Sequence, residues 1–305
     1  MSAVRLDDRV AIVTGAGRSL GRAYARALAE AGAAVVVNDV DAAAADTVVA
    51  EITETGGRAV AEVGPVGPTS TAQALVERAV AEFGRLDVLV ANAGVLRDRV
   101  LWKMTDEDFD AVVETHLRGS FTCGRAAAQH FRDRGEGGRI ILVGSPAGQF
   151  GSFGQTNYSA VKAGIVAMAR TWSLELARAG VTVNTIVPTA LSPMTATIPE
   201  YTQAYQDHVA GLPIPEHLRR ERALGSVDDV APLVVWLASD RAAHVTGQAI
   251  GIGGDRLTLY AHPDILATDD ALGGWSAEAI DRAWSERFAA RAQLSGPPSR
   301  REQPA

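Results

Sequence analysis

The hydrophobic positions of the chain form short continuous runs that are separated by longer alanine-rich stretches. A strand reads as a continuous apolar run when both of its faces are buried, and helical stretches between such strands indicate right-handed crossovers. The pattern therefore predicts an α/β fold with a single doubly wound parallel sheet and helices on both faces. The predicted strands are Val10–Val13, Ala34–Val37, Leu86–Val90, Arg139–Val143 and Val181–Ile186.

The alternation of strands and helices weakens after Pro188. Prolines at positions 193, 199, 213 and 215 interrupt a polar and aromatic stretch that ends at Gly225. Because long loops often carry function, we interpret residues around 189–225 as a mobile lid, with a plain surface excursion as the alternative. The domain that contains the sheet and this lid is expected to span residues 1–255.

Residues 256–305 are expected to form a helical C-terminal extension. Ser276 is a candidate N-cap for an amphipathic helix with Ile280, Ala283, Trp284 and Phe288 on one face. This apolar stripe is expected to be buried. The last segment, from Ser295 to Ala305, has no apolar pattern and is expected to be disordered.

Composition excludes several classes of protein. The 305 residues are 47% hydrophobic and 21% charged, which is typical of a globular chain. The net charge of −7 and the lack of a basic stripe argue against a nucleic-acid partner. The single cysteine, Cys123, excludes an intrachain disulfide, and the six histidines lack metal-binding spacing, so no metal is expected. Without a signal peptide or a long apolar run, a cytoplasmic location without membrane contact is expected.

A glycine-rich turn follows the first predicted strand. Gly15, Gly17 and Gly21 lie in the segment Thr14-Gly-Ala-Gly-Arg-Ser-Leu-Gly21, directly before a helical stretch. Such a turn lets backbone N–H groups approach a pyrophosphate at the helix N-terminus. The turn therefore indicates a dinucleotide site, although a tight strand-to-helix connection is the structural alternative.

Asp39 ends the second predicted strand, 39 − 21 = 18 residues after Gly21. A carboxylate at this place accepts hydrogen bonds from ribose hydroxyls and repels a 2′-phosphate, which favours NAD over NADP. Arg18 favours NADP if its guanidinium contacts a 2′-phosphate, and has no effect on the choice if it points to solvent. NAD is the expected cofactor, and NADP remains open.

Three further motifs occur in order along the chain. Asn92-Ala93-Gly94 follows the strand that ends at Val90, Ser145 follows Val143, and Tyr158 and Lys162 lie four residues apart on one helix face. The spacing from serine to tyrosine is 158 − 145 = 13 residues. From Leu6 to Asp255 the chain resembles the short-chain dehydrogenase/reductase family, which has a Rossmann-type sheet.

The resemblance implies a catalytic set of Ser145, Tyr158 and Lys162. A free tyrosine has a pKa of about 10, so Lys162 and an oxidised nicotinamide are expected to stabilise the phenolate, while Ser145 holds the substrate oxygen. A buried tyrosine hydroxyl with a surface lysine is the alternative. The resemblance implies cofactor contacts at Gly15, Gly17, Arg18, Ser19, Leu20, Gly21, Asp39, Val66, Asn92, Ala93, Gly94, Tyr158, Lys162 and Pro188.

His116 stands where the family usually has an asparagine that completes a proton relay to the lysine. An imidazole can also donate and accept hydrogen bonds, so we interpret His116 as the relay residue; a core histidine is the alternative. Further departures from the family pattern are Ser19 in place of a glycine, Pro65 in place of an aspartate that contacts adenine, and Thr189 in place of the glycine after Pro188.

The stretches around His116 and Tyr158 resemble the subgroup that contains the (3R)-hydroxyacyl-CoA dehydrogenase domain of the peroxisomal multifunctional enzyme and its bacterial relatives. The resemblance implies an NAD-dependent oxidoreductase for a secondary alcohol or ketone, such as a 3-hydroxyacyl-CoA or a steroid-like substrate. An NADPH-dependent biosynthetic ketoreductase and a non-catalytic dinucleotide-binding protein are the alternatives. A homo-oligomer, most simply a tetramer, is expected from the resemblance and from the alanine-rich helices at Phe109–Phe131 and Tyr158–Ala177.

Overall fold

The fold is described from a computed structural model that covers residues 4–293 and residue 296. The chain divides into two compact units, of which the first ends at Tyr260 and the second begins at Ala261.

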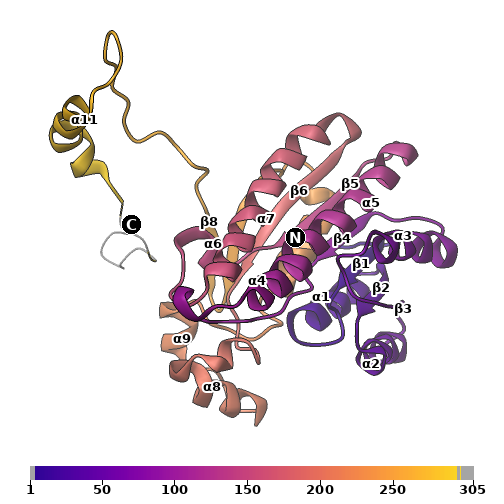
Figure 1. Cartoon of the computed structure of the whole chain (residues 1–305). Helices are drawn as coiled ribbons and strands as arrows, with labels where there is room; N and C mark the ends of the chain where they lie inside the picture. Colours follow the sequence, from indigo (N-terminus) through magenta and orange to yellow (C-terminus); the bar gives the residue numbers. More distant parts are fainter. Residues whose placement is uncertain (1–3, 294–295, 297–305) are drawn as a thin grey trace. The chain divides into compact units, whose positions relative to one another are not determined.

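The first unit is built on an eight-stranded sheet with the order β3-β2-β1-β4-β5-β6-β7-β8 (Figure 1). Strands β1 to β7 pair in parallel, which confirms the doubly wound sheet. The sequence analysis predicted β1, β2, β4, β5 and β6 but not β3, β7 or β8, and β8 pairs antiparallel with β7. The strands are β1 (Val10–Thr14), β2 (Ala34–Asp39), β3 (Arg58–Val63), β4 (Val88–Ala91), β5 (Gly138–Val143), β6 (Val181–Pro188), β7 (Ala249–Gly253) and β8 (Arg256–Leu259).

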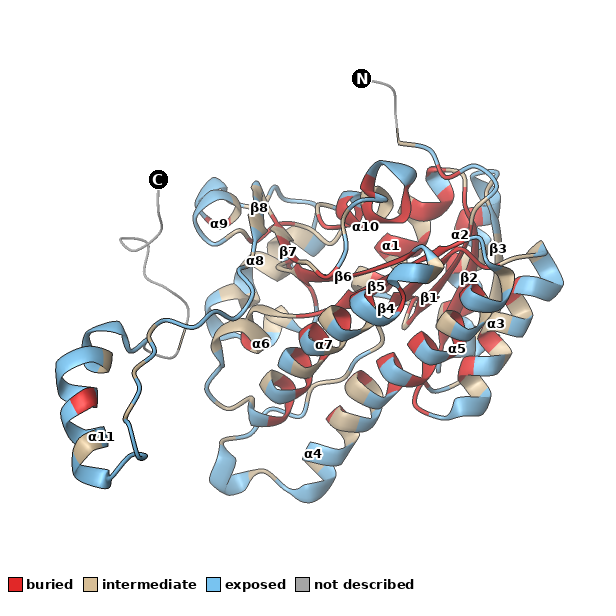
Figure 2. Ribbon diagram, turned by 90° about the horizontal axis from the view of Figure 1, so that it is seen from above, coloured by how far each residue is buried: buried red, intermediate tan, exposed pale blue. Residues whose placement is uncertain are grey.

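Helices cover both faces of the sheet (Figure 2). One face carries α1 (Ser19–Glu30), α2 (Ala42–Glu54) and α10 (Ala231–Ala238), and the other carries α3 (Thr69–Phe83), α5 (Gly119–Arg134) and α7 (Thr156–Glu175). Shorter segments connect them: η1 (Leu101–Lys103), α4 (Asp106–Val112), the π-helical turn η2 (Val113–Arg118), α6 (Pro146–Phe150), and the 3₁₀ turns η3 (Ala177–Ala179) and η5 (Asp240–Ala242).

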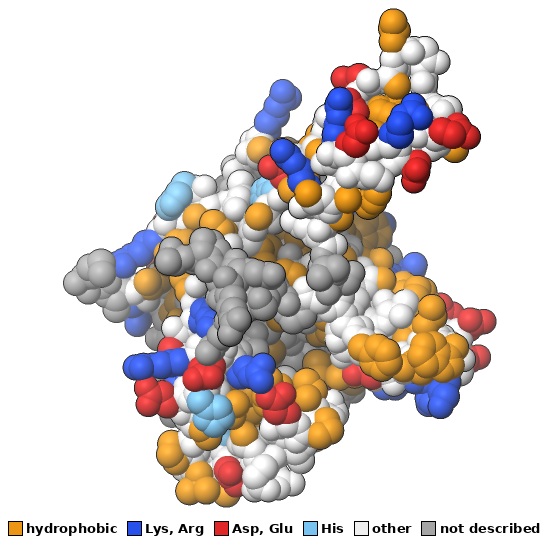
Figure 3. Space-filling view, turned by 90° about the vertical axis from the view of Figure 1, so that its left-hand side faces the viewer, with side chains coloured by type: hydrophobic (Ala, Val, Ile, Leu, Met, Phe, Trp, Pro, Cys, Tyr) orange, Lys and Arg blue, Asp and Glu red, His pale blue; other side chains and the backbone are white. Residues whose placement is uncertain are grey.

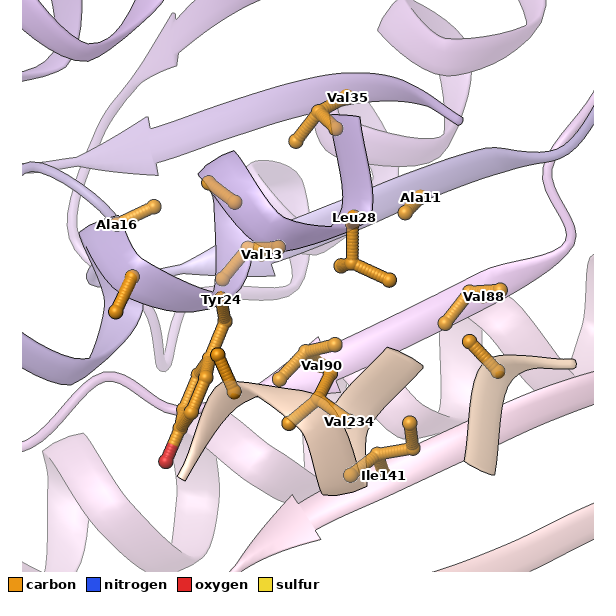
Figure 4. Close-up of a cluster of buried hydrophobic side chains, with 14 of the residues drawn as sticks. Ala11, Val13, Ala16, Tyr24, Leu28, Val35, Val88, Val90, Ile141 and Val234 are labelled. Atoms are coloured by element: carbon orange, nitrogen blue, oxygen red, sulfur yellow. The ribbon is translucent and has the colours of Figure 1, made fainter. Parts of the chain in front are cut away.

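The strands form continuous apolar layers because both faces of the sheet are covered. Val13, Val35 and Val90 are fully buried beneath α1 and α10, together with Tyr24 and Leu28 of α1 (Figure 4). Burying a side chain of this size contributes about 1.5–3 kcal/mol relative to leaving it exposed. The two apolar layers hold the carboxyl ends of the strands in fixed positions.

The strand order reverses direction between β1 and β4. The chain winds outward from β1 to β3 on one side and from β4 to β7 on the other. Ligands of open parallel sheets bind at such a switch point, outside the carboxyl ends of the strands. The glycine turn after β1 and the Asn92–Gly94 loop after β4 both lie at this point.

The region expected to be a lid contains η4 (Thr195–Thr197), α8 (Pro199–Val209) and α9 (Glu216–Glu221). Arg219 of α9 pairs with Asp229 at 2.8 Å and with Asp255 at 2.8 Å, which ties the second half of the region to the sheet domain. The sheet also continues past the expected domain end at residue 255, because β8 pairs with β7.

The second unit contains α11 (Ala277–Ala283), followed by η6 (Trp284–Phe288) and η7 (Ala289–Arg291). Ser276 caps α11, as predicted, by accepting a hydrogen bond from the Ala279 N–H at 3.2 Å. Within this unit Ala283 is buried, whereas Ile280 and Trp284 are each 54% exposed, so burial of the apolar stripe stays a prediction. The tail expected to be disordered, Ser295–Ala305, lies outside the described residues apart from Gly296.

Acidic and basic side chains are interspersed over the face shown in Figure 3. Within residues 4–293, no helix has the length and apolar character needed to cross a membrane.

Candidate active site

The glycine turn packs closely against the loop after β4. A Cβ atom on Gly15 would lie 2.7 Å from the Ala93 Cα, and one on Gly21 would lie 2.1 Å from the Gly15 carbonyl oxygen. Gly15 also has a φ of +61°, which favours glycine. Glycine is therefore required at both positions for α1 to begin this close to the sheet.

Helix α1 begins at Ser19 with its first N–H groups free of a side-chain cap, because the side chain of Arg18 makes no capping hydrogen bond. Ser19 has a φ of +51°, a left-handed conformation that costs a non-glycine residue on the order of 1 kcal/mol. The serine therefore keeps the backbone shape that a glycine would adopt. An uncapped helix N-terminus beside a glycine turn fits the pyrophosphate of a dinucleotide.

Asp39 is part of the turn as well as the end of β2. Its Oδ2 accepts a hydrogen bond from the Gly17 N–H at 2.9 Å, and its Oδ1 accepts one from the Asp41 N–H at 3.1 Å. Asp39 is buried, whereas Arg18 is exposed and pairs with Asp41 at 3.0 Å. Two backbone hydrogen bonds thus hold the buried carboxylate of Asp39 against the turn, while the guanidinium of Arg18 pairs with Asp41.

Thr14 and Asn92 join the loops after β1 and β4. The Thr14 Oγ1 accepts hydrogen bonds from the Asn92 N–H at 3.0 Å and the Ala93 N–H at 3.1 Å. The Asn92 side chain donates to the carbonyl oxygens of Thr14 and Gly15. Asn92, one of the predicted cofactor residues, therefore holds the two loops together. Its partner Thr14 was not among the site residues predicted from the sequence.

The other predicted cofactor residues lie on neighbouring segments. Val66 is buried and packs closely against α5. A Cβ atom on Gly119 of that helix would lie only 2.7 Å from the Val66 Cγ2. Pro188 ends β6 and pairs with Ile252 of β7. Gly64 donates its N–H to the Asp39 carbonyl at 3.0 Å, whereas Pro65 has no N–H and no polar side chain. The part of the site that is expected to hold adenine therefore has no carboxylate at position 65.

The structure brings the predicted catalytic residues together. Ser145 follows β5 and caps α6 by accepting from the Ala147 N–H at 3.2 Å. Tyr158 and Lys162 lie one turn apart on α7, and the Lys162 Nζ is 5.4 Å from the centroid of the Tyr158 ring. His116 reaches the same phenol from η2, with its ring edge-on and the two centroids 5.3 Å apart.

Lys162 is buried, which excludes the alternative of a surface lysine. Its Nζ donates to the Val143 carbonyl oxygen at 2.6 Å. Burial lowers the pKa of Lys162 to about 7, because the charged ammonium loses its hydration. Lys162 can therefore gain or lose a proton near neutral pH.

Without a bound cofactor or substrate, the hydroxyl group of Tyr158 is protonated at neutral pH. Burial raises the pKa of the phenol to about 12, and a hydrogen bond with Ser145 opposes this effect only in part. The hydroxyl oxygen lies 4.0 Å from the Sδ of Met194, at the start of the region expected to be a lid. A substrate oxygen that reaches Tyr158 must therefore share this space with the Met194 thioether.

His116 is held by the loop that follows Gly94. Its Nε2 lies 3.0 Å from the Val95 N–H nitrogen and 2.8 Å from the Val95 carbonyl oxygen, and its Nδ1 is buried without a partner among the described residues. Burial, followed by the charge of Lys162, lowers the pKa of His116 to about 3. The imidazole is therefore neutral at physiological pH and keeps one ring nitrogen available within the site.

Asn157 is a functional residue that the sequence reasoning missed. It is fully buried, and its Nδ2 donates at 3.0 Å to the carbonyl oxygens of Arg97 and Asp108. Its Oδ1 accepts the Tyr158 N–H at 2.8 Å. The amide thereby fixes the first turn of α7 against the loop after β4. The sequence feature that could have identified Asn157 is its position directly before Tyr158.

Comparisons with known proteins agree with this geometry. The family model of the short chain dehydrogenases matches residues 9–203. The mouse peroxisomal multifunctional enzyme type 2 is 44% identical over 78% of the chain, which spans only 31% of that enzyme's length. Hydroxyacyl-CoA dehydrogenase ChsB1 of Mycobacterium tuberculosis is 38% identical over 94% of the chain and 90% of its own length. A crystal structure of a short chain dehydrogenase from Mycobacterium avium has a TM-score of 0.82 and 36% identity and covers 97% of this chain and 99% of that one.

Proposed function

The chain belongs to the short chain dehydrogenase family, and we propose that it is an NAD-dependent oxidoreductase that oxidises the hydroxyl group of a 3-hydroxyacyl-CoA. The family supports an oxidoreductase that acts on a secondary alcohol or ketone. The observation that carries the proposal is the convergence of Tyr158, Lys162, Ser145 and His116 beside the glycine turn, at the switch point of the sheet.

The preference for NAD rests on Asp39. A 2′-phosphate would bring negative charge against a buried carboxylate that already accepts two backbone hydrogen bonds. Arg18 is the one basic side chain of the turn, and its pairing with Asp41 reduces its availability for a phosphate. These contacts support NAD over the NADPH-dependent alternative.

A bound nicotinamide cofactor supplies the hydride acceptor and, when oxidised, a positive charge. Tyr158 exchanges a proton with the substrate oxygen at its hydroxyl group, and Ser145 holds that oxygen by a second hydrogen bond. Lys162 lies over the phenol ring, where its ammonium form stabilises a phenolate. The neutral His116 supports the loop after β4 and offers its Nδ1 to a hydrogen-bonded relay that includes Lys162.

Two observations support the 3-hydroxyacyl-CoA class. The mycobacterial relative that matches nearly the whole chain is named as a hydroxyacyl-CoA dehydrogenase. Large apolar side chains also lie exposed on the loops next to the site: Leu101 and Trp102 after β4, and Phe153 before α7. The isolated bridge between Arg99 and Gln155 holds these two loops side by side, so an extended acyl group has apolar surface to contact.

Assembly as a homotetramer is part of the proposal. Phe121 of α5 and Leu174 of α7 are 41% and 80% exposed, and a second copy of the chain would cover them. The cytoplasmic location expected from the sequence stays a prediction.

The test is NAD⁺ reduction measured with a panel of both stereoisomers of 3-hydroxyacyl-CoAs, simple secondary alcohols and sterols, with NADP⁺ in parallel. We expect turnover of one 3-hydroxyacyl-CoA stereoisomer with NAD⁺. Turnover of sterols or simple alcohols alone would overturn the substrate class while leaving the oxidoreductase intact. No turnover of any alcohol, combined with tight binding of NAD⁺, would favour the non-catalytic alternative.

A further inference from the structure

A hollow opens at the amino ends of β5 and β6, at the opposite end of the sheet from the active site. Its volume is about 730 Å³, and the arginines 132, 139 and 178 line it together with Glu136. Strand β5 separates it from Ser145, and six residues of strand span about 17 Å. The hollow is therefore separate from the site described above.

The lining of the hollow is positive, although the whole chain carries a net charge of −7. Arg132 and Arg178 are exposed, and neither forms an ion pair with any of the described residues. The carboxylate of Glu136 forms ion pairs with Arg85 at 3.3 Å and with Arg134 at 3.5 Å. Two guanidinium groups are thus available to a ligand, and the one acidic side chain is already engaged.

Arg139 is a buried cation beneath these two. It donates to the Gly138 carbonyl oxygen at 3.0 Å and pairs with Asp240 at 3.3 Å, but its Nε is buried without a partner among the described residues. Burial, followed by the charge of Arg9, lowers the pKa of Arg139. Since a buried cation is stabilised by negative charge nearby, an anion in the hollow would offset part of this cost.

Two glycine turns form the wall of the hollow. Gly137 and Gly180 have φ values of +73° and +68°, and a Cβ on Gly137 would lie 2.6 Å from the Gly180 carbonyl oxygen. Side chains at these positions would strain the backbone, so glycine keeps the two turns in contact at the wall of the hollow.

We propose that this hollow binds a small phosphate-bearing molecule. The planar guanidinium groups of Arg132 and Arg178 can each donate two hydrogen bonds to phosphate oxygens. The volume is larger than a single phosphate ion requires and falls within the range of small-molecule sites, on the order of 300–1,000 Å³. The ligand is therefore a phosphate ester or a diphosphate in preference to inorganic phosphate alone.

The test is isothermal titration calorimetry on the full chain, saturated with its nicotinamide cofactor so that the glycine turn after β1 cannot bind the probe. Inorganic phosphate, pyrophosphate and adenosine monophosphate are titrated separately. We expect one site per chain, with pyrophosphate or the monophosphate binding more tightly than phosphate. The double variant Arg132→Gln/Arg178→Gln should weaken this binding at least tenfold.

Arg58→Gln is the matched control, because Arg58 is exposed, lies at the amino end of β3 and forms no ion pair with the described residues. Its affinity for the probes should equal that of the wild type. Equal melting temperatures of the ligand-free proteins would show that the substitutions leave the fold intact. Absence of binding in the cofactor-saturated wild type, or unchanged affinity in the double variant, would overturn the proposal.

Discussion

The imidazole ring of His116 packs edge-on against the phenol ring of Tyr158, with an interplanar angle of 84°. The two residues come from different elements, the π-helical turn η2 and helix α7. The Nε2 of the same imidazole contacts the backbone of Val95, in the loop after β4. One side chain therefore links the loop after β4 to Tyr158.

Tyr158→Phe should remove most of the turnover while leaving cofactor binding intact. The substitution deletes the proton-transfer group, whose contribution is on the order of 10²–10⁴-fold, and retains the ring contacts with His116 and Lys162. Steady-state rates and the Kd for NAD⁺ test this. Activity near that of the wild type would exclude Tyr158 as the base.

Asp39→Asn should shift cofactor choice toward NADP. The amide removes the charge that repels a 2′-phosphate but can still accept the hydrogen bond from the Gly17 N–H. We expect the ratio of kcat/KM for NAD⁺ to that for NADP⁺ to fall about tenfold or more, equivalent to about 1.4 kcal/mol.

Asp46→Asn is the matched control for this variant, because Asp46 is exposed on α2, outside the turn, and forms no ion pair with the described residues. Its ratio should stay close to that of the wild type. A wild-type preference for NADP⁺ would contradict the role of Asp39.

His116→Asn should retain more activity than His116→Ala. An asparagine can restore hydrogen bonds to the Val95 backbone and to the relay, whereas alanine leaves both without a partner. Because the pKa of His116 is about 3, its titration should not appear in the wild-type pH–rate profile between pH 5 and 8. Equal kcat values for the two variants, with changes only in melting temperature, would show a packing role instead.

Lys162→Met should change how stability depends on pH. The folded chain holds Lys162 with a pKa of about 7, below the value of 10.5 for a free lysine. Between these values the unfolded chain binds the proton and the folded chain does not, so this group makes stability rise with pH by up to about 1.4 kcal/mol per unit.

Denaturant unfolding at several pH values between 7 and 10 measures this effect. The wild type should gain free energy of unfolding relative to Lys162→Met as the pH rises through this window. A parallel pH dependence of the two proteins would indicate that Lys162 keeps its ordinary pKa in the fold. The variant should also be inactive.

Leu174→Glu should break the proposed oligomer into smaller species. A charge in place of a leucine that is 80% exposed on α7 would be buried at an interface between copies. Light scattering at micromolar concentration tests this. Val80→Glu on α3, which is outside the predicted interface and 39% exposed, is the control. A wild type that is monomeric would contradict the oligomer.

Local pattern predicted much of this protein. The apolar runs located β1, β2, β4, β5 and β6, and the family resemblance carried by Ser145, Tyr158 and Lys162 indicated the candidate catalytic set. These predictions succeed because continuous apolar runs report burial on both faces, and because residues four apart share a helix face. The glycine pattern likewise reports a backbone shape that is determined within a few residues.

The tertiary structure decided which groups the site residues contact. Asn157 anchors α7 through the carbonyl of Arg97, sixty residues earlier in the chain. Lys162 titrates near neutral pH because it is buried beside the Val143 carbonyl, which no local pattern shows. Strand β8 was missed because its four residues alternate between half-buried and exposed positions and depend on β7 for pairing. Hydrogen-bond partners and desolvation depend on segments that are distant in sequence, so periodicity and spacing cannot specify them.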